Sequence, residues 1–394
     1  MSPLPLTGIT VVALEQAVAM PFATRQLADL GARVIKIERP GTGDFARDYD
    51  ARVRGLSSHF AWLNRTKESL TLDVKQPDAK DVLRRLLAKA DVFVHNLAPG
   101  AVERLGFGKA RLTADHPRLI VCEISGYGAT GPYRDRRAYD LLVQSEAGLL
   151  AVTGTEEAPA KAGIAVADIA GGTYALSSIL AALIARGRTG HGSVIEISLF
   201  DALVEWMGYP IYYASGGEGA PRRTGAHHAT IAPYGPYPTG DGQTVYLAVQ
   251  NDREWRRLCA DVLDDPTVAD DPRFVTNADR IVHRGALNQR IVERFATLSA
   301  DTAIVLLDGA QIACARMNTV EQTSDHPQLI ERNRWRHVAS PNGPIPALVP
   351  PFGIQGMSPA MGPIPAIGEH TDAILGELGI HRSTIEAWRT AGVI

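Results

Sequence analysis

Short apolar runs alternate with helix-like stretches along the first part of the chain. The runs have the length and the residue types of buried strands, and they lie at 8–14, 33–38, 69–74, 91–97 and 118–124. Helical patterns separate several of them, which is typical of parallel strands that are joined by helices. The pattern therefore predicts an α/β domain built on a parallel sheet.

Two of the helices carry boundary signals. Residues 21–30 have a helical pattern, and Gly31 follows them as a carboxyl-terminal cap. Another helix is expected to begin at Pro77, a residue that suits the first position of a helix. Its apolar stripe consists of Val82, Leu83, Leu86, Leu87 and Ala90.

The second half of the chain has a less regular pattern. Residues 216–242 are rich in Gly, Pro, His and Arg, and we interpret them as a linker or functional loop. The other expected elements are a helix at about 139–150, a long helix that ends at Arg186, a strand and helix within 192–207, a strand at 244–250, mostly helical sequence to about residue 320, and a final helix after Thr371.

Three common cofactor and enzyme motifs are missing from the places where they would carry a function. No GxGxxG follows the first strand, where a dinucleotide-binding fold would carry it. No GxxxxGK[ST] loop for ATP and no GxSxG elbow of a serine hydrolase is found either. The sheet is therefore expected to be Rossmann-like without binding NAD, FAD or ATP through these motifs.

Composition excludes several classes of protein. Of the 394 residues, 45% are hydrophobic and 21% are charged, as in a soluble globular protein long enough for two domains. The net charge of -3 creates no general field that would attract nucleic acid or an anionic membrane. We expect neither of these partners.

The cysteines and the apolar segments indicate a reducing, aqueous setting. Cys122, Cys259 and Cys314 are an odd number at wide spacing, without a zinc-binding pattern. The amino terminus lacks the positive region of a signal peptide. The longest apolar helical stretch, 175–185, is about half of a membrane span. We expect a cytoplasmic protein with no metal.

Asp168 is the main candidate for chemistry. It precedes the glycine pair Gly171 and Gly172 at the start of the long helix, where the helix dipole favours an ionised carboxylate. Such a carboxylate is a nucleophile, and nearby backbone N–H groups, approached closely at the glycines, would stabilise an oxyanion. The alternative is that Asp168 only caps the helix.

The whole chain resembles the family III CoA-transferases, the group that includes formyl-CoA transferase and carnitine CoA-transferase. The resemblance rests on pieces that occur in the family's order. They are LGARVIKIERPGTGD (30–44), NRTKESLTLDVK (64–75), NLAPGAVERLGFG (96–108), SGYGATGPYRDRRAYDLLVQS (125–145), GIAVADIAGG (163–172) and IGEHTDAILGELG (367–379).

The resemblance implies a set of site residues. Asp168 falls on the catalytic aspartate, and Asp140, beside Tyr139, falls on an acidic partner that orients it or shares a proton. The implied coenzyme A contacts are Gln16, Ala17, Val18, Arg39, Leu72, Asp73, Val74, Lys75, Asn96, Leu97, Ala98, Arg104, Arg137 and Ala138. The cations among them suit the phosphates of CoA. CoA is a substrate here, and no permanently bound cofactor is expected.

The implied chemistry passes through covalent intermediates on Asp168. An aspartyl-acyl anhydride forms first and an aspartyl-CoA thioester second, and both stay activated. The sequence departs from formyl-CoA transferase at two places. The glycine-run lid has no counterpart, its nearest candidate being 216–242, and positions 16–18 read Gln-Ala-Val where the relative has a His and a Gln.

Two other functions remain open at this point. An α-methylacyl-CoA racemase needs a base in a GHD-like motif, where this chain has AYD with Tyr139. Tyrosine is a poor base near neutral pH because its ordinary pKa is about 10. A catalytically silent CoA-binding protein is the other alternative, against which the retained Asp168 argues.

The acceptor acid is indicated only by the resemblance. Residues 192–207, 222–237 and 249–255 are similar to family members that act on C4 and C5 dicarboxylates. A basic cluster would bind the distal carboxylate, and it consists of Arg222, Arg223, His227 and His228. The alternative is that this segment is a solvated loop.

The resemblance also implies the architecture. A large Rossmann-like domain at 1–215 is completed by residues 326–394, and 216–325 form a linker and a smaller inserted domain. Two subunits of the family interlock, so a homodimer is expected.

Overall fold

The computed structural model describes residues 3–217 and 219–394 of the chain. The described chain separates into two compact units. The sheet unit consists of Met1–Gly148, Ala162–Gly208 and Ile330–Ile394, and the small unit consists of Leu149–Lys161 and Tyr209–Leu329. The sheet unit thus resumes at Ile330, close to the expected residue 326, whereas residues 149–161 cluster with the small unit.

A six-stranded parallel sheet organises the sheet unit, in the order β3-β2-β1-β4-β5-β6. Its strands are β1 (Thr10–Leu14), β2 (Arg33–Glu38), β3 (Lys67–Thr71), β4 (Val92–His95), β5 (Ile120–Ser125) and β6 (Val194–Ser198). Most strand residues are buried because helices cover both faces, as a parallel sheet requires. The prediction of an α/β fold with a parallel sheet is confirmed.

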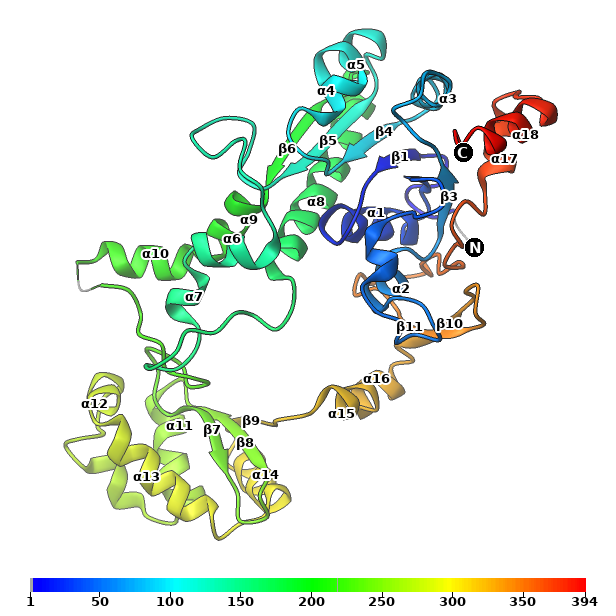
Figure 1. Ribbon diagram of the computed structural model, residues 1–394. Coiled ribbons are helices and arrows are strands. Elements are labelled where there is room, and N and C mark those ends of the chain that lie inside the picture. Colours follow the sequence, from blue (N-terminus) through cyan, green and yellow to red (C-terminus); the bar gives the residue numbers. More distant parts are fainter. Residues whose placement is uncertain (1–2, 218) are drawn as a thin grey trace. The chain divides into compact units, whose positions relative to one another are not determined.

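Helices α1 (Ala19–Asp29) and α8 (Val166–Thr189) cover one face of the sheet, and α3 (Pro77–Leu87) covers the other (Figure 1). The expected cap of α1 is present, since Gly31 follows the helix end with φ +101, a conformation that favours glycine. Pro77 occupies the first turn of α3, also as expected. The core on the face of α3 includes Ile374 and Leu375.

The carboxyl-terminal segment is part of the sheet unit. Helices α17 (Thr371–Glu377) and α18 (Arg382–Thr390) contribute Ile374, Leu375 and Ile385 to the same core as β1 and β3. The Asp73 backbone N–H donates to the carbonyl oxygen of Val393 at 2.8 Å. The last residues therefore pack beside the end of β3.

The remaining elements of the sheet unit lie around its edges and its loops. They are the 3-10 helix η1 (Phe45–Asp48), α2 (Ser58–Leu63), α4 (Ala101–Leu105), α5 (Lys109–Asp115), α6 (Asp140–Glu146), α9 (Leu199–Trp206), and the antiparallel strands β10 (Trp335–Val338) and β11 (Ile345–Leu348). Helices α7 (Leu149–Val152), α10 (Gly208–Ser215), α15 (Val320–Ser324) and α16 (Pro327–Glu331) lie in or beside the segments that join the two units.

The small unit is built on an antiparallel sheet of order β7-β8-β9. Its elements are β7 (Tyr234–Pro238), β8 (Thr244–Ala248), β9 (Ala313–Arg316), α11 (Asp252–Arg257), η2 (Leu258–Val262), η3 (Pro266–Asp270), α12 (Asn277–Val282), α13 (Arg284–Phe295) and α14 (Ala300–Gly309). Tyr237, Trp255 and Phe295 are fully buried in its core. The interpretation of 216–242 as a loop was therefore wrong for its last part, which contains β7.

Helix α8 is longer than the apolar stretch recognised in the sequence. Among the residues that the structure describes, it is the one helix whose length and composition would allow it to cross a membrane, with 24 residues and a mean hydropathy of 1.4. The estimate of half a span was therefore too short. Its buried side chains, among them Ala167, Ala175 and Ile179, belong to the same core as α1. Core packing thus accounts for part of its apolar character, while other apolar side chains of the helix, such as Ile184, are exposed.

Candidate active site

Four of the predicted CoA-binding segments follow the carboxyl ends of neighbouring strands. Residues 16–18 follow β1, Arg39 follows β2, 72–75 follow β3 and 96–98 follow β4. Parallel strands end at one edge of the sheet, so these segments share that edge. The order in which successive strands are added to the sheet reverses between β1 and β4. Open α/β sheets bind their ligands at such a point.

Direct hydrogen bonds join three of these residues. The Gln16 N–H donates to Asn96 Oδ1 at 3.0 Å, and Asn96 Nδ2 donates to the Gln16 carbonyl oxygen at 2.8 Å. Arg39 Nη2 donates to Gln16 Oε1 at 3.4 Å. The loops after β1, β2 and β4 are therefore tied together at the point where strand order reverses.

The predicted cations are available for anions. Arg39, Lys75, Arg104 and Arg137 are exposed, and none of them pairs with a carboxylate within the described parts of the chain. The Arg104 side chain donates a hydrogen bond to the carbonyl oxygen of Pro99 at 3.5 Å. Such side chains can make charge-assisted bonds to phosphate without first breaking an ion pair.

A cavity of about 230 Å³ lies between the loops that follow β4 and β5. Leu97 and Ala98 line it, together with His95, Glu123 and Lys109, which the sequence analysis did not single out. His95 and Glu123 are partners in the register of β4 and β5, and Lys109 Nζ lies 3.1 Å from Glu123 Oε1. The sequence did contain a signal for two of these residues, since His95 and Glu123 are polar residues within otherwise apolar strand runs. Burial lowers the pKa of His95 to about 4, so its ring is neutral.

Asp168 lies in the first turn of α8 and is partly buried. Burial raises the pKa of its carboxyl to about 7, and the nearby charge of Asp140 adds to this rise. The sequence indicated that the helix end favours the ionised form, whereas burial and the charge of Asp140 act against it.

Asp140 supplies the cap that α8 lacks locally. The residue before the helix, Ala165, has no side chain that can accept a hydrogen bond. Asp140 Oδ1 instead accepts from the N–H groups of Ala167 at 2.8 Å and Asp168 at 3.3 Å, and its Oδ2 accepts from Gln144 Nε2 at 2.6 Å. Asp140 is thus next to the candidate nucleophile and fixed to its backbone.

The first N–H groups of α8 are all occupied. Those of Ala167 and Asp168 bond to Asp140, while the Val166 and Ile169 N–H groups donate to the carbonyl oxygens of Ile164 and Ala165. An oxyanion would therefore have to displace one of these acceptors, and the expected oxyanion hole stays a prediction.

Gly171 and Gly172 have a packing role inside α8. A Cβ atom on Gly171 would lie 2.6 Å from Leu199 Cδ2, and one on Gly172 would lie 2.5 Å from the carbonyl oxygen of Ala19. The Leu199 side chain can move aside for a Cβ on Gly171, but the backbone carbonyl of Ala19 leaves room only for glycine at position 172. The glycines thus let α8 pack closely against α9 and α1, and no bond of theirs to an oxyanion is indicated.

Substituting Gly172 with alanine should destabilise the protein by about 1–3 kcal/mol, because a backbone carbonyl cannot move aside as a flexible side chain can. Thermal or denaturant unfolding would measure this change. Gly187→Ala is the matched control in the same helix, since nothing lies within 4 Å of its added Cβ. The control should be neutral or slightly stabilising. Equal effects of the two substitutions would show that the close approach is not important.

Tyr49 was missed by the sequence analysis. It follows η1, is 47% exposed, and packs edge-on against the His59 ring at 5.3 Å. Burial raises its pKa, and the negative charges of Asp44 and Asp168 contribute, which places its phenol within electrostatic range of Asp168. No local motif signals this residue. Tyr139, also predicted for the site, is 69% exposed at the start of α6, and Ala138 and Arg137 precede it.

The predicted basic cluster lies in the small unit, and its members differ. Arg223 donates from Nε to the carbonyl oxygen of Thr155 at 2.8 Å and from Nη2 to that of Glu156 at 3.0 Å. It therefore has a structural role in this unit. Arg222 is exposed.

His227 and His228 lie near an arginine that the sequence analysis missed. Burial and then the charge of Arg284 lower the pKa of both histidines, which favours neutral rings. Arg284 Nη2 donates to the carbonyl oxygen of Ala229 at 3.0 Å, while its buried Nη1 finds no partner within the described chain. The histidines thus act as hydrogen-bonding groups more than as charges.

No group of three or more His, Cys, Asp or Glu side chains that could hold a metal ion is found in residues 3–217 and 219–394.

Known proteins match nearly the whole chain. Residues 6–371 match the model of the family described as CoA-transferase family III. The succinate–glutarate CoA-transferase of Agrobacterium fabrum is 35% identical over 386 residues, which cover 95% of this chain and 96% of the relative. The human succinyl-CoA:glutarate CoA-transferase is 32% identical over 379 residues, covering 95% and 86%. The crystal structure of a CAIB/BAIF family protein from Brucella suis has a TM-score of 0.85 and 33% identity, covering 96% and 100%.

Proposed function

The chain belongs to CoA-transferase family III and is a CoA-transferase, and we propose that it moves CoA from a donor such as succinyl-CoA to a free dicarboxylic acid through Asp168. The observation that carries the catalytic assignment is the carboxyl of Asp168, partly buried in the first turn of α8 beside Asp140. The relatives' names support the donor and the class of acceptor.

The first half of the reaction loads CoA onto the enzyme. The Asp168 carboxylate attacks the donor thioester carbonyl, the carbon–sulfur bond breaks, and CoA leaves as a thiolate. The thiolate then attacks the aspartyl carbonyl of the anhydride, and the donor acid leaves as a carboxylate. The enzyme now holds CoA as an aspartyl thioester. Partial burial of Asp168 limits the access of water to both intermediates.

The second half reverses these steps with the acceptor. The acceptor carboxylate attacks the aspartyl thioester and releases CoA thiolate, which forms a new anhydride on Asp168. The thiolate then attacks the acyl carbonyl of the acceptor, and the Asp168 carboxylate is restored. No proton is gained or lost over the cycle, so a carboxylate nucleophile is sufficient.

We also propose that the exposed cations hold the phosphates of CoA. Arg39, Lys75, Arg104 and Arg137 lack competing carboxylate partners in the described chain, and the loops that carry Arg39 and Lys75 share one sheet edge with Gln16 and Asn96. The cavity beside Leu97 and Ala98 would accommodate an uncharged part of the cofactor.

The acceptor class can be tested by a screen. Succinyl-CoA as donor should give transfer to glutarate and other C4 or C5 dicarboxylates, and much less to butyrate. Arg222→Ala should weaken dicarboxylate acceptors by about 1.5–3 kcal/mol, the range for hydrogen bonds to charged groups, and leave monocarboxylates nearly unchanged. Equal losses for both, or none, would contradict a carboxylate contact at Arg222.

The rate of the first half-reaction should depend on the ionisation of Asp168. Since its pKa is raised to about 7, the carboxyl is mostly protonated at lower pH and cannot attack. The value of kcat/KM for the acyl-CoA donor should therefore fall about tenfold per pH unit below pH 7 and level off above it. A profile that stays flat between pH 5 and 8 would show that the carboxylate is ionised throughout.

A homodimer is a further part of the proposal. Several large apolar side chains of the sheet unit are 46–61% exposed, and they are Leu141, Leu142, Ile184 and Trp206. These side chains lie on α6, α8 and α9, which pack against one another, and contiguous apolar surface is typical of places that meet another chain. Light scattering of the purified protein would give twice the mass of the chain.

A further inference from the structure

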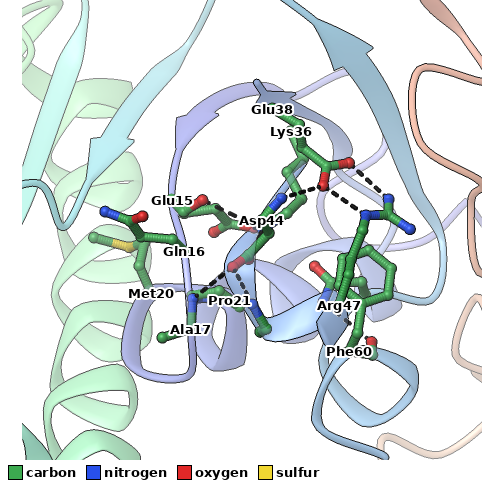
Figure 2. Close-up of polar contacts among 12 residues, drawn as sticks. Glu15, Gln16, Ala17, Met20, Pro21, Lys36, Glu38, Asp44, Arg47 and Phe60 are labelled. Atoms are coloured by element: carbon green, nitrogen blue, oxygen red, sulfur yellow. Dashed lines mark hydrogen bonds and ion pairs between the residues drawn. The ribbon is translucent and has the colours of Figure 1, made fainter. Parts of the chain in front are cut away.

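A buried network of charged side chains joins the carboxyl ends of β1 and β2 to Lys67, the first residue of β3 (Figure 2). It consists of Glu15, Lys36, Glu38, Asp44, Arg47 and Lys67. The side chains of Glu15, Lys36 and Lys67 are 0% exposed, so they cannot touch a substrate. Most of the network nevertheless comes from segments 30–44 and 64–75, which carry the family resemblance. Its position suggests what these residues do instead.

Asp44 connects this network to the turn that follows β1. Its Oδ2 accepts from Lys36 Nζ at 2.8 Å. Its Oδ1 accepts from the Ala17 N–H at 3.1 Å and from the Ala46 N–H at 2.9 Å. Its own N–H donates to Glu38 Oε1 at 3.0 Å. Both carboxylate oxygens are therefore occupied, and one of them holds a backbone group of the turn.

The turn needs such support because Ala17 has a left-handed backbone with φ +63. This conformation costs a residue with a Cβ roughly 1–2 kcal/mol, so the surrounding contacts must maintain it. Asp44 holds Ala17 from one side, while Asn96 bonds both backbone groups of Gln16 from the other. Figure 2 shows the Gln16 side chain pointing away from Asp44.

Asp44 also belongs to the loop that carries Arg39. The Gly43 N–H donates to the Arg39 carbonyl oxygen at 3.0 Å, and the Arg39 guanidinium reaches Gln16 Oε1. A single carboxylate thus connects two neighbouring segments of the edge where CoA is proposed to bind.

We propose that Asp44, held by Lys36, is a positioning residue that fixes the Gln16–Val18 turn and its contact with Arg39 in the geometry that CoA binding requires. The inference rests on the proposed assignment of Gln16, Ala17, Val18 and Arg39 as CoA contacts. Asp44 itself is too buried, at 4% exposure, to contact the cofactor.

The first experiment compares two isosteric substitutions of buried aspartates. Asp44→Asn places an amide against Lys36 and weakens the hold on Ala17. Asp29→Asn disturbs an equally buried carboxylate that pairs with Arg25 and Arg65 and makes no contact with the turn. Both variants should have a lower Tm. Titration calorimetry with CoA is carried out below the melting temperatures of both variants. Binding should be at least about tenfold weaker for Asp44→Asn and unchanged for Asp29→Asn. A tenfold loss corresponds to about 1.4 kcal/mol, the size expected for a lost hydrogen-bonding arrangement.

Steady-state kinetics should separate positioning from general damage. Asp44→Asn should raise KM for the acyl-CoA donor much more than it lowers kcat, since the nucleophile Asp168 is untouched. Asp29→Asn should not change KM. Unchanged CoA affinity in Asp44→Asn would overturn the inference, and so would an equal loss of affinity in Asp29→Asn.

A second variant keeps all charges and disturbs the same turn without changing Asp44. Ala17→Val places a β-branched residue at a positive φ, which such residues strongly disfavour, and should weaken CoA binding as Asp44→Asn does. Because both changes disturb one turn, the double variant should lose little more than the worse single one. If the fold losses of CoA affinity in the two single variants multiply in the double variant, the valine merely collides with CoA. That result would overturn the inference. If the wild type transfers CoA while both single variants bind CoA normally, this inference fails and the proposed function stands. A wild type without transfer activity would refute the proposed function itself.

Discussion

Substituting Asp168 with asparagine should lower the rate of CoA transfer by at least about 10⁴-fold, a loss typical of removing a nucleophile. Asparagine has nearly the same shape but cannot form an anhydride with the donor. Binding of CoA should persist, because the predicted contacts lie on other segments. Exchange of CoA between two acids, followed by mass spectrometry, measures the first effect, and titration calorimetry measures the second.

A matched control is available in the neighbouring helix. Asp201 also lies in the first turn of its helix, α9, and Asp201→Asn should leave the transfer rate nearly unchanged. Hydroxylamine added during turnover should label the peptide that contains Asp168, since anhydrides and thioesters both react with it. If Asp168→Asn kept more than about one per cent of the activity, the covalent role in this mechanism would be lost.

The parallel sheet was predictable because its strands are short apolar runs, and β2 agrees with the expected residues 33–38. Strand β7 was not predictable by the same rule. Its sequence, Tyr-Gly-Pro-Tyr-Pro, contains two prolines and a glycine, which normally argue against a strand. The structure places β7 at the edge of its sheet, where missing N–H groups are tolerated. Tertiary position thus decided what local propensity could not.

The location of Asp168 at a helix start was predictable from its motif, but its electrostatics were not. Its raised pKa depends on burial and on Asp140, a residue 28 positions earlier in the chain. The local sequence implied that the first N–H groups of α8 are free. Asp140 accepts hydrogen bonds from two of them, and this contact could not be read from the local sequence. Tyr49 and Arg284 were missed for a related reason, because their neighbours in space are distant in sequence.

Glu15→Gln should destabilise the sheet unit by about 3–5 kcal/mol, the cost of breaking a buried ion pair by removing one partner. Glu15 accepts from Lys67 Nζ at 2.6 Å and from Thr24 Oγ1 at 2.6 Å, and all three side chains are buried. Although burial raises the pKa of this carboxyl, the charges of Lys67 and Lys36 lower it overall, so the native fold holds an ionised Glu15. Denaturant unfolding at neutral pH measures the loss.

The control for this substitution is Glu68→Gln, which changes the same chemical group at the surface. Glu68 pairs with Arg33 at 2.8 Å, but the two side chains are 27% and 36% exposed. An exposed pair of this kind contributes about 0–1 kcal/mol, so the control should lose far less stability. Similar losses for the two variants would mean that solvent screens the buried network as well as it screens the surface.

The pH dependence of the Glu15→Gln variant gives a sharper test of the same idea. Burial lowers the pKa of Lys67 to about 8 even with Glu15 present, and removing Glu15 takes away the main charge that raises it. Lys67 should therefore lose its proton at a lower pH in the variant than in the wild type, which removes the unpaired buried charge of the variant first. The stability difference from the wild type should shrink as the pH rises from 7 to about 8, where Lys67 of the wild type also begins to lose its proton. A difference that stays constant from pH 7 to 9 would show that the cost comes from packing or hydrogen bonding, and not from the uncompensated charge of Lys67.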